Sequence, residues 1–291
     1  MDVEKIIKTY FKGRSGVIAT MHKKEEVMKP ILEGYLDIKV TVPKEFNTDE
    51  YGTFTRDIKR RGDQQEAARF KLKGALKLTG ESLGFASEGV FGPHPQAPFI
   101  PFNQELVLLY DQENNLEIVG VSSTTETNFD HKTISSYDEA YEFCKMVSFP
   151  EHAVVIKVKE NSKKSKEIIK GITTEKGLTD AVEYALKKSK NGTIFIETDM
   201  RALYNPSRMK NIESATHNLI KNIYNICPDC KTPGFTVVEN KKGLPCSLCG
   251  FPSRSTLSVI YRCTKCKHEK EELYPNGVKH VDPMHCSYCN P

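Results

Sequence analysis

Eight of the nine cysteines fall into four Cys-x-x-Cys pairs in the last quarter of the chain. The pairs are Cys227/Cys230, Cys246/Cys249, Cys263/Cys266 and Cys286/Cys289. Two residues between cysteines let both sulfurs of a tight turn reach one metal ion, and the gaps between successive pairs suit zinc ribbons. The tail is therefore expected to bind two zinc ions through all eight thiolates.

Four thiolates complete the tetrahedral shell of zinc and leave no open position, so both sites are expected to be structural. Pairing in sequence order, the first pair with the second and the third with the fourth, fits the spacing best, and a crossed pairing stays open. A disulfide framework is the alternative. It is disfavoured because the amino-terminal residues show no apolar core of signal-peptide length.

The charge of the chain bears on its partners. Lys and Arg number 42 and Asp and Glu 38, a formal net charge of +4 that two zinc–thiolate centres would cancel. A nucleic-acid binder is expected to show a clustered basic face, and the tail offers only a short run from Arg262 to Lys270. Nucleic acid is thus a weakly supported partner. No stretch approaches the roughly 18 apolar residues of a membrane span, so a cytoplasmic protein without a membrane partner is expected.

The 291 residues have room for one larger domain, residues 1–225, followed by a double zinc ribbon over residues 226–291. Alternating apolar patterns in the front part predict a layered α/β domain with a mixed sheet and flanking helices. Strands are predicted over residues 16–20, 38–42, 83–87, 105–110, 116–121, 153–157 and 193–197. Helices are predicted over residues 25–35, 63–79, 137–147 and 176–189, and from Asn205 onward.

Two segments, residues 85–95 and 197–209, carry glycines and charges at the predicted carboxyl ends of strands, where α/β sheets bind ligands. Arg208 falls near the third position of its predicted helix, at the positive end of the helix dipole. That position is unfavourable for a cation unless an anion pairs with it. The alternative to a bound anion is an internal salt bridge with Glu197 or Asp199.

Three passages, GFASEGVFGPHP, ETDMRALYNPSRM and CSYCNP, resemble an uncharacterised bacterial family that joins an α/β domain to a C-terminal double zinc ribbon. A more distant resemblance covers roughly residues 16–125. The passages IATMHKKEE, GDQQEAARFKLKGALKLTG and LGFASEGVF are similar to the inosine and xanthosine triphosphate pyrophosphatases. This second resemblance implies a nucleotide-binding fold for the front part.

The resemblance to the pyrophosphatases is partial in the loop that receives the nucleotide. Ala19 and Thr20 match the Ala-Thr pair of that loop. His22 stands where the family has asparagine, and Glu25 stands where it has lysine. These departures weaken the implication of catalysis more than that of the fold.

In the helix and strand that follow, Glu66 and Lys71 match the family's helix, and Glu88 matches one of the acidic residues that hold magnesium. Ser87 replaces the neighbouring acid. Glu66 also has a purely structural interpretation, as the capping-box partner of Asp63.

The resemblance implies a magnesium-dependent phosphohydrolase that acts on a nucleotide or another phosphorylated small molecule. Glu66 and Glu88 would hold Mg²⁺, and Asp199 would join the metal or act as a base. The expected substrate-binding residues are Thr20, His22, Lys71, His94, Arg201 and Arg208. The alternative is a non-catalytic zinc protein that binds a nucleotide or nucleic acid.

Overall fold

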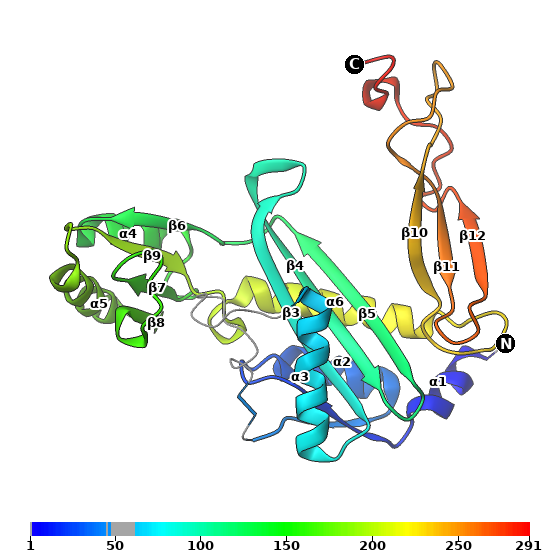
Figure 1. Ribbon diagram of the computed structural model, residues 1–291, viewed down its shortest axis with the longest axis horizontal. Coiled ribbons are helices and arrows are strands. Elements are labelled where there is room, and N and C mark those ends of the chain that lie inside the picture. Colours follow the sequence, from blue (N-terminus) through cyan, green and yellow to red (C-terminus); the bar gives the residue numbers. More distant parts are fainter. Residues whose placement is uncertain (1, 45, 48–61) are drawn as a thin grey trace. The chain divides into compact units, whose positions relative to one another are not determined.

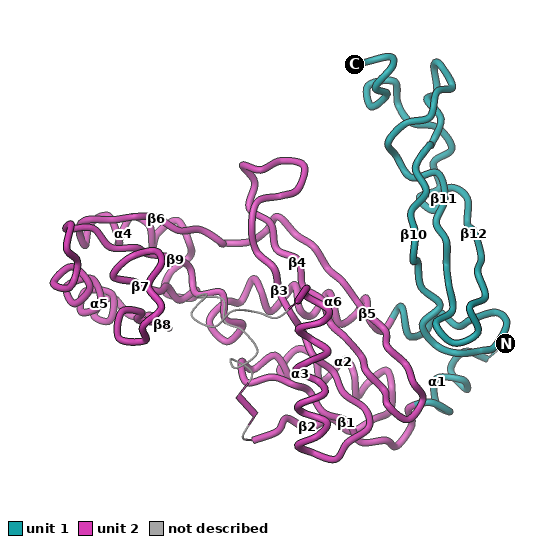
Figure 2. The backbone as a smooth tube through the Cα atoms, in the orientation of Figure 1, with its two compact units in different colours: residues 1–10, 221–291 teal, residues 11–220 magenta. Residues whose placement is uncertain are grey.

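The structure is a computed structural model that describes residues 2–44, 46–47 and 62–291. The chain forms two compact units, coloured separately in Figure 2. The larger is Phe11–Ile220, and the smaller combines Met1–Tyr10 with Lys221–Pro291. The division falls inside the last long helix, and the boundary expected at residue 225 stays a prediction.

The larger unit contains a five-stranded mixed sheet in the order β2-β1-β3-β4-β5. Its strands are β1 (Ser15–Ile18), β2 (Lys39–Thr41), β3 (Leu83–His94), β4 (Ala97–Asp111) and β5 (Leu116–Thr124). Strands β2, β1 and β3 run parallel, whereas β3, β4 and β5 form antiparallel hairpins. The mixed α/β architecture expected from the sequence is confirmed.

Helices cover both faces of this sheet (Figure 1). Helix α3 (Gln64–Thr79) lies on one face, and α2 (Glu25–Leu36) and α6 (Pro206–Tyr224) lie on the other. The capping box between Asp63 and Glu66 starts α3, and Gly80, at φ 75°, ends it. The side chain of Asn205 accepts a hydrogen bond from the backbone N–H of Arg208, which caps α6. These helix signals of the sequence are confirmed.

A second sheet in the larger unit has the order β6-β9-β7-β8 and is antiparallel throughout. Its strands are β6 (His131–Ile134), β7 (Val154–Lys157), β8 (Ile168–Ile172) and β9 (Ile194–Thr198). Helices α4 (Tyr137–Met146) and α5 (Glu175–Lys188) pack their apolar residues on it in one buried cluster. The short strands β6 and β8 were missed from sequence, because runs of four and five residues show little periodicity.

The smaller unit is built on helix α1 (Val3–Phe11) and a three-stranded antiparallel sheet. Strand β11 (Thr256–Arg262) lies between β10 (Thr236–Lys242) and β12 (Glu269–Leu273). Few of its residues are buried apart from cysteines and their neighbours. Such a unit has little apolar core of its own, so metal binding is expected to supply much of its stability.

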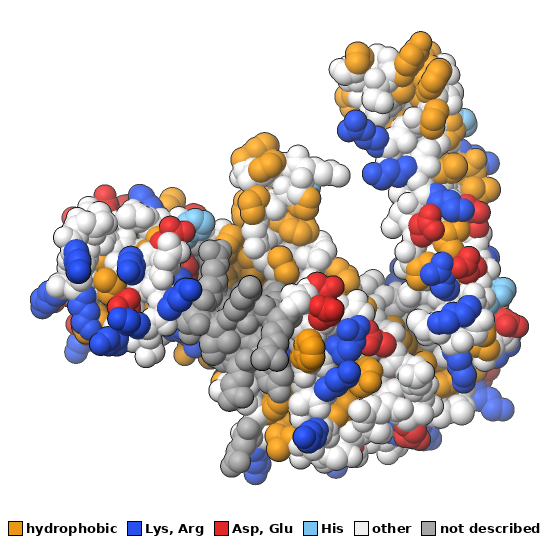
Figure 3. Space-filling view, in the orientation of Figure 1, with side chains coloured by type: hydrophobic (Ala, Val, Ile, Leu, Met, Phe, Trp, Pro, Cys, Tyr) orange, Lys and Arg blue, Asp and Glu red, His pale blue; other side chains and the backbone are white. Residues whose placement is uncertain are grey.

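The glycine-rich segment 85–95 is not a loop at a strand end, which corrects the sequence interpretation. Strand β3 continues through it to His94 and turns into β4, forming a long hairpin whose tip carries hydrophobic side chains, as Figure 3 shows. Phe99 at this tip is 87% exposed. Strand β1 ends at Ile18, opposite Phe85, so β1 does not cover the edge of β3 beyond that point.

No helix among the described residues is long and apolar enough to cross a membrane.

Helix α6 packs closely against strand β5 at Gly120. A Cβ atom at Gly120 would lie 2.2 Å from the backbone nitrogen of Leu219 and 2.4 Å from the carbonyl oxygen of Ala215. Because backbone atoms cannot move aside as a side chain can, Gly120→Ala is expected to lower the free energy of unfolding by about 1–3 kcal/mol or more. Urea denaturation measures the loss.

Gly34 in α2 is the matched control, since a Cβ there would meet nothing within 4 Å. Gly34→Ala is expected to raise stability by up to about 1 kcal/mol, the helix-propensity gain of alanine over glycine. Equal effects of the two substitutions would contradict the close packing of α6 on β5.

Candidate metal centres and a buried charge cluster

The eight paired cysteines form two tetrads in the smaller unit. Cys227, Cys230, Cys263 and Cys266 make one, and Cys246, Cys249, Cys286 and Cys289 make the other. Within each tetrad all sulfurs lie within 4.8 Å of one another. Individual Sγ–Sγ distances are 3.7 Å for Cys227–Cys266 and 3.5 Å for Cys230–Cys263. Four sulfurs at 2.3 Å around a tetrahedral ion would lie about 3.8 Å apart, so each tetrad can hold a zinc ion.

The grouping of the cysteines corrects the in-order pairing favoured by the spacing. The first pair joins the third and the second joins the fourth, which is the crossed arrangement. The physical reason is the antiparallel sheet. Strand β10, seven residues long, spans roughly 23 Å between the first and second pairs, too far for one ion to bridge. Strand β11 then returns the chain to the end where it began.

All four Cys-x-x-Cys pairs adopt the same local turn. The backbone N–H four residues after each first cysteine donates to that cysteine's carbonyl, as Lys231 does to Cys227 at 3.1 Å. At three of the pairs this residue has a positive φ: 61° at Lys231, 70° at Gly250 and 63° at Lys267. The repeated geometry aims both sulfurs of each pair inward and makes the four turns equivalent as metal-binding knuckles.

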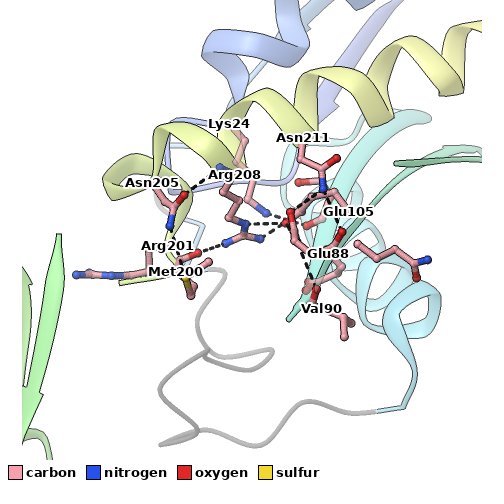
Figure 4. A network of polar contacts seen from close by, with 12 residues as sticks. Lys24, Glu88, Val90, Glu105, Met200, Arg201, Asn205, Arg208 and Asn211 are labelled. Atoms are coloured by element: carbon pink, nitrogen blue, oxygen red, sulfur yellow. Dashed lines mark hydrogen bonds and ion pairs between the residues drawn. The ribbon is translucent and has the colours of Figure 1, made fainter. Parts of the chain in front are cut away.

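The larger unit contains a cluster of buried charges where β1 ends and β3 continues. Its five members, which we call the charge cluster, are Lys24, Lys71, Glu88, Glu105 and Arg208, all at most 8% exposed. They come from the start of α2, from α3, β3 and β4, and from the first turn of α6. Figure 4 shows Lys24 and Arg208 reaching toward the two glutamates. Buried charges are costly unless paired, so their gathering in one place is significant.

On the α6 face, Arg208 and Glu105 form a fully buried ion pair. The Arg208 Nε atom lies 2.8 Å from Glu105 Oε1, and Arg208 Nη1 donates to the carbonyl of Met200. Gly89 faces Glu105 across the hairpin, and a Cβ atom there would lie 2.2 Å from Glu105 Oε1 and 2.8 Å from Arg208 Nη2. The glycine thus leaves the room that the ion pair occupies.

On the α3 face, Lys71 pairs with Glu88. Lys24 lies at the edge of β3 that β1 leaves uncovered, and its ammonium donates to the carbonyl of Ser87 at 2.9 Å. Burial, and then the positive charges of Arg208 and Lys71, lower the pKa of Lys24 to about 7, while Glu105 and Glu88 oppose the shift. Lys24 therefore changes charge near neutral pH.

The other residues predicted for a nucleotide site lie around or away from the charge cluster. Thr20 is buried and accepts a hydrogen bond from the backbone N–H of His22 at 3.2 Å. Glu66 is exposed and accepts from the backbone of Asp63 in the capping box. His94 lies near the tip of the long hairpin, against Phe102.

Asp199 and Arg201 pair with each other at 2.7 Å, and Arg201 points away from Glu105 in Figure 4. Arg208 forms an internal salt bridge, as the alternative to a bound anion predicted, but its partner is Glu105. The suggested partners were wrong, because Asp199 binds Arg201 and Glu197 binds Lys157. The structure brings together Lys71, Glu88 and Arg208 of the predicted set, and the charges of all three shift the pKa of Lys24. It does not bring Arg201 to them.

Sequence reasoning missed two members of the charge cluster, Lys24 and Glu105. Glu105 has a signal in the alternation of β4, since it is in phase with the buried residues Val107 and Leu109. A carboxylate on the inward face of a strand needs a buried partner. Asn211 shares the inward face of α6 with Arg208 and donates to Asn103 Oδ1 at 2.6 Å. The spacing of these two polar residues along α6 is therefore a second sequence signal of a buried polar site.

The crossed cysteine grouping predicts how zinc is lost from double variants. Cys230→Ser with Cys263→Ser removes two ligands from one tetrad and should leave one zinc per chain after a challenge with a chelator. Cys230→Ser with Cys246→Ser removes one ligand from each tetrad, so the chelator should remove zinc from both sites. Elemental analysis after dialysis measures both. The opposite result, in which only the second variant keeps one zinc, would support the in-order pairing.

The buried Arg208–Glu105 pair predicts an asymmetric response to substitution. Arg208→Met leaves Glu105 buried without its partner and should cost about 3–5 kcal/mol in the free energy of unfolding. Arg208→Met combined with Glu105→Leu removes both charges and should recover most of that loss. A double-mutant cycle by urea denaturation measures the coupling. Additive losses would show that the two residues act independently.

The chain was also compared with known proteins. The family model described as a domain of unknown function (DUF6671) matches residues 71–291, which include four members of the charge cluster, all except Lys24, and all eight cysteines of the tetrads. No curated protein matches the chain. The resemblance to the triphosphate pyrophosphatases therefore stays a hypothesis. Because the matched model covers well over half of its length, the chain belongs to the DUF6671 family.

Proposed function

We propose that the larger unit binds the phosphate groups of a nucleotide or another phosphorylated small molecule at the charge cluster. The observation that carries the proposal is its charge: three buried cations, Lys24, Lys71 and Arg208, accompany two buried carboxylates, and Lys24 interacts electrostatically with the other four members. With Lys24 protonated, the cluster has one positive charge in excess. A buried excess charge is stabilised by a counterion, and a phosphate group would supply one.

A hydroxyl group next to the charge cluster supports the same proposal. Ser87 is 2% exposed, and its Oγ atom has no hydrogen-bond partner among the described residues. In the register of the β3–β4 hairpin it lies on the same face as Glu105 and Gly89. A buried hydroxyl without a partner costs free energy that a bound phosphate oxygen or water would recover. Arg208 lies in the first turn of α6, where the helix dipole also favours an anion.

The residues present do not fit a resident magnesium ion. Glu88 lies opposite Leu106, and Glu105 lies opposite Gly89, so the two carboxylates leave opposite faces of the hairpin. Each is already paired with a cation. Among the described residues, only the cysteine tetrads gather three or more candidate ligands. Binding is therefore the function that the geometry favours, and magnesium-dependent hydrolysis stays a prediction from the sequence resemblance.

The smaller unit contributes stability through its two candidate zinc centres, whose four-sulfur shells are closed. Nucleic-acid binding by its sheet is less well supported. Its cations are partly neutralised by neighbouring acids, as in the pairs Lys241–Glu271 and Arg262–Glu269. Figure 3 shows Lys and Arg side chains gathered over the region of α5 and β8, but acidic residues lie among them there too.

The proposal predicts a pH-dependent affinity for anions. Sulfate keeps its charge between pH 6 and pH 9, and should stabilise the protein more at pH 6 than at pH 8.5, because Lys24 loses its proton as the pH rises through its pKa of about 7. Thermal-shift titrations at constant ionic strength measure the difference. Lys24→Met is the matched variant and should abolish it.

Tripolyphosphate tests the same site more strongly. It should bind the wild-type protein and fail to bind folded Lys24→Met, which lacks the excess positive charge of the charge cluster. Equal binding by both proteins would place phosphate recognition elsewhere and reject the proposal. Release of phosphate or pyrophosphate from a nucleoside triphosphate with Mg²⁺, lost in Glu88→Gln, would instead establish the hydrolase that the sequence resemblance implies.

A further inference from the structure

A pocket opens beside the charge cluster, at the carboxyl ends of the adjacent parallel strands β1 and β2. Its volume is about 580 Å³, within the range of small-molecule sites. The residues after β1, among them Thr20, Lys23 and Glu25, form one side, and Pro43 and Phe46 after β2 contribute to the other. Loops that leave neighbouring parallel strands are a preferred place for ligands in α/β sheets.

The pocket and the charge cluster share one segment of chain. Lys23 and Glu25 line the pocket, and Lys24, between them in sequence, reaches into the charge cluster (Figure 4). Lys23 has φ 58°, in the left-handed region that is rare for residues other than glycine. This backbone turn allows the side chains of Lys23 and Lys24 to contribute to two different sites, the pocket and the charge cluster.

Glu25 gives this pocket a hydrogen-bond acceptor. Its Oε2 atom is buried and has no hydrogen-bond partner among the described residues, although two lysines, Lys23 and Lys44, also line the pocket. The exposed ammonium of Lys23 lies 3.7 Å from Glu26 instead. Burial of a carboxylate oxygen without a donor costs free energy, which an N–H group of a ligand at this oxygen would recover.

We propose that this pocket binds a nucleobase that presents two adjacent N–H donors, as guanine does, with Glu25 as the acceptor. The inference rests on the proposed phosphate-binding function and names the molecule that carries the phosphates. Guanine offers its ring N–H and amino group side by side, which suits a carboxylate. Adenine places a ring-nitrogen acceptor beside its single amino group, and that acceptor would face the negative charge. Phe46, which packs against the apolar core under α3, also lines the pocket.

Isothermal titration calorimetry with four ligands tests the inference: GTP, ATP, guanosine and inorganic tripolyphosphate. GTP is expected to bind the wild-type protein roughly tenfold to a hundredfold more tightly than ATP, the range expected for hydrogen bonds to a charged acceptor. Glu25→Gln should reduce this ratio to less than about threefold, because the neutral amide gives a weaker acceptor. Glu26→Gln, in the same helical turn and exposed, is the matched control and should keep the full ratio.

The ligands separate failure of this inference from failure of the proposed function. Equal affinities for GTP and ATP, with tripolyphosphate bound, would overturn the guanine pocket and leave the phosphate site intact. Binding of guanosine without binding of tripolyphosphate would support the pocket and reject the phosphate site. If none of the four ligands binds, both proposals are wrong. Circular dichroism and melting temperatures confirm that each variant is folded.

Discussion

The ion pair between Arg208 and Glu105 is the constraint on which the larger unit depends. Both side chains are fully buried, so each hydrogen-bonding atom of the pair needs a partner inside the protein. Glu105 must lie on the inward face of β4, Gly89 must lack a side chain, and the carbonyl of Met200 must be free to accept. Because Met200 follows β9 and Glu105 lies in β4, Arg208, in the first turn of α6, connects the second sheet with the first.

The smaller unit depends on a different constraint, the geometry of four sulfurs around one ion. Its sheet has too few buried apolar residues to explain its order, whereas two tetrads fix both ends of the three strands. The strands in turn hold the tetrads apart, since β10 is too long for one ion to span. A metal ion in each tetrad and the sheet would therefore stabilise each other, as is usual in small metal-binding units.

Local signals in the sequence predicted local structure well. Asp63 and Glu66 mark the start of α3, Asn205 and Pro206 mark that of α6, and the spacing of the cysteines identifies every member of the two tetrads. Interactions between distant residues could not be predicted in this way. Glu105 and Arg208 lie 103 positions apart, and the local sequence around one residue does not indicate that the other is its partner. The cysteine grouping was also wrong, because it depends on strands whose pairing local spacing does not reveal.

The crossed grouping of the cysteines has a consequence for how the protein is made. Cys227 lies 39 positions before Cys266, its partner in the first tetrad, and Cys246 lies 43 before Cys289. When Cys266 emerges during synthesis, the second tetrad is still half made. In a tandem of separate ribbons, the first could load zinc before the second existed. Here the nascent chain must carry unfilled thiolates for longer, so oxidation or a mismatched metal is a hazard of translation that the folded protein no longer faces.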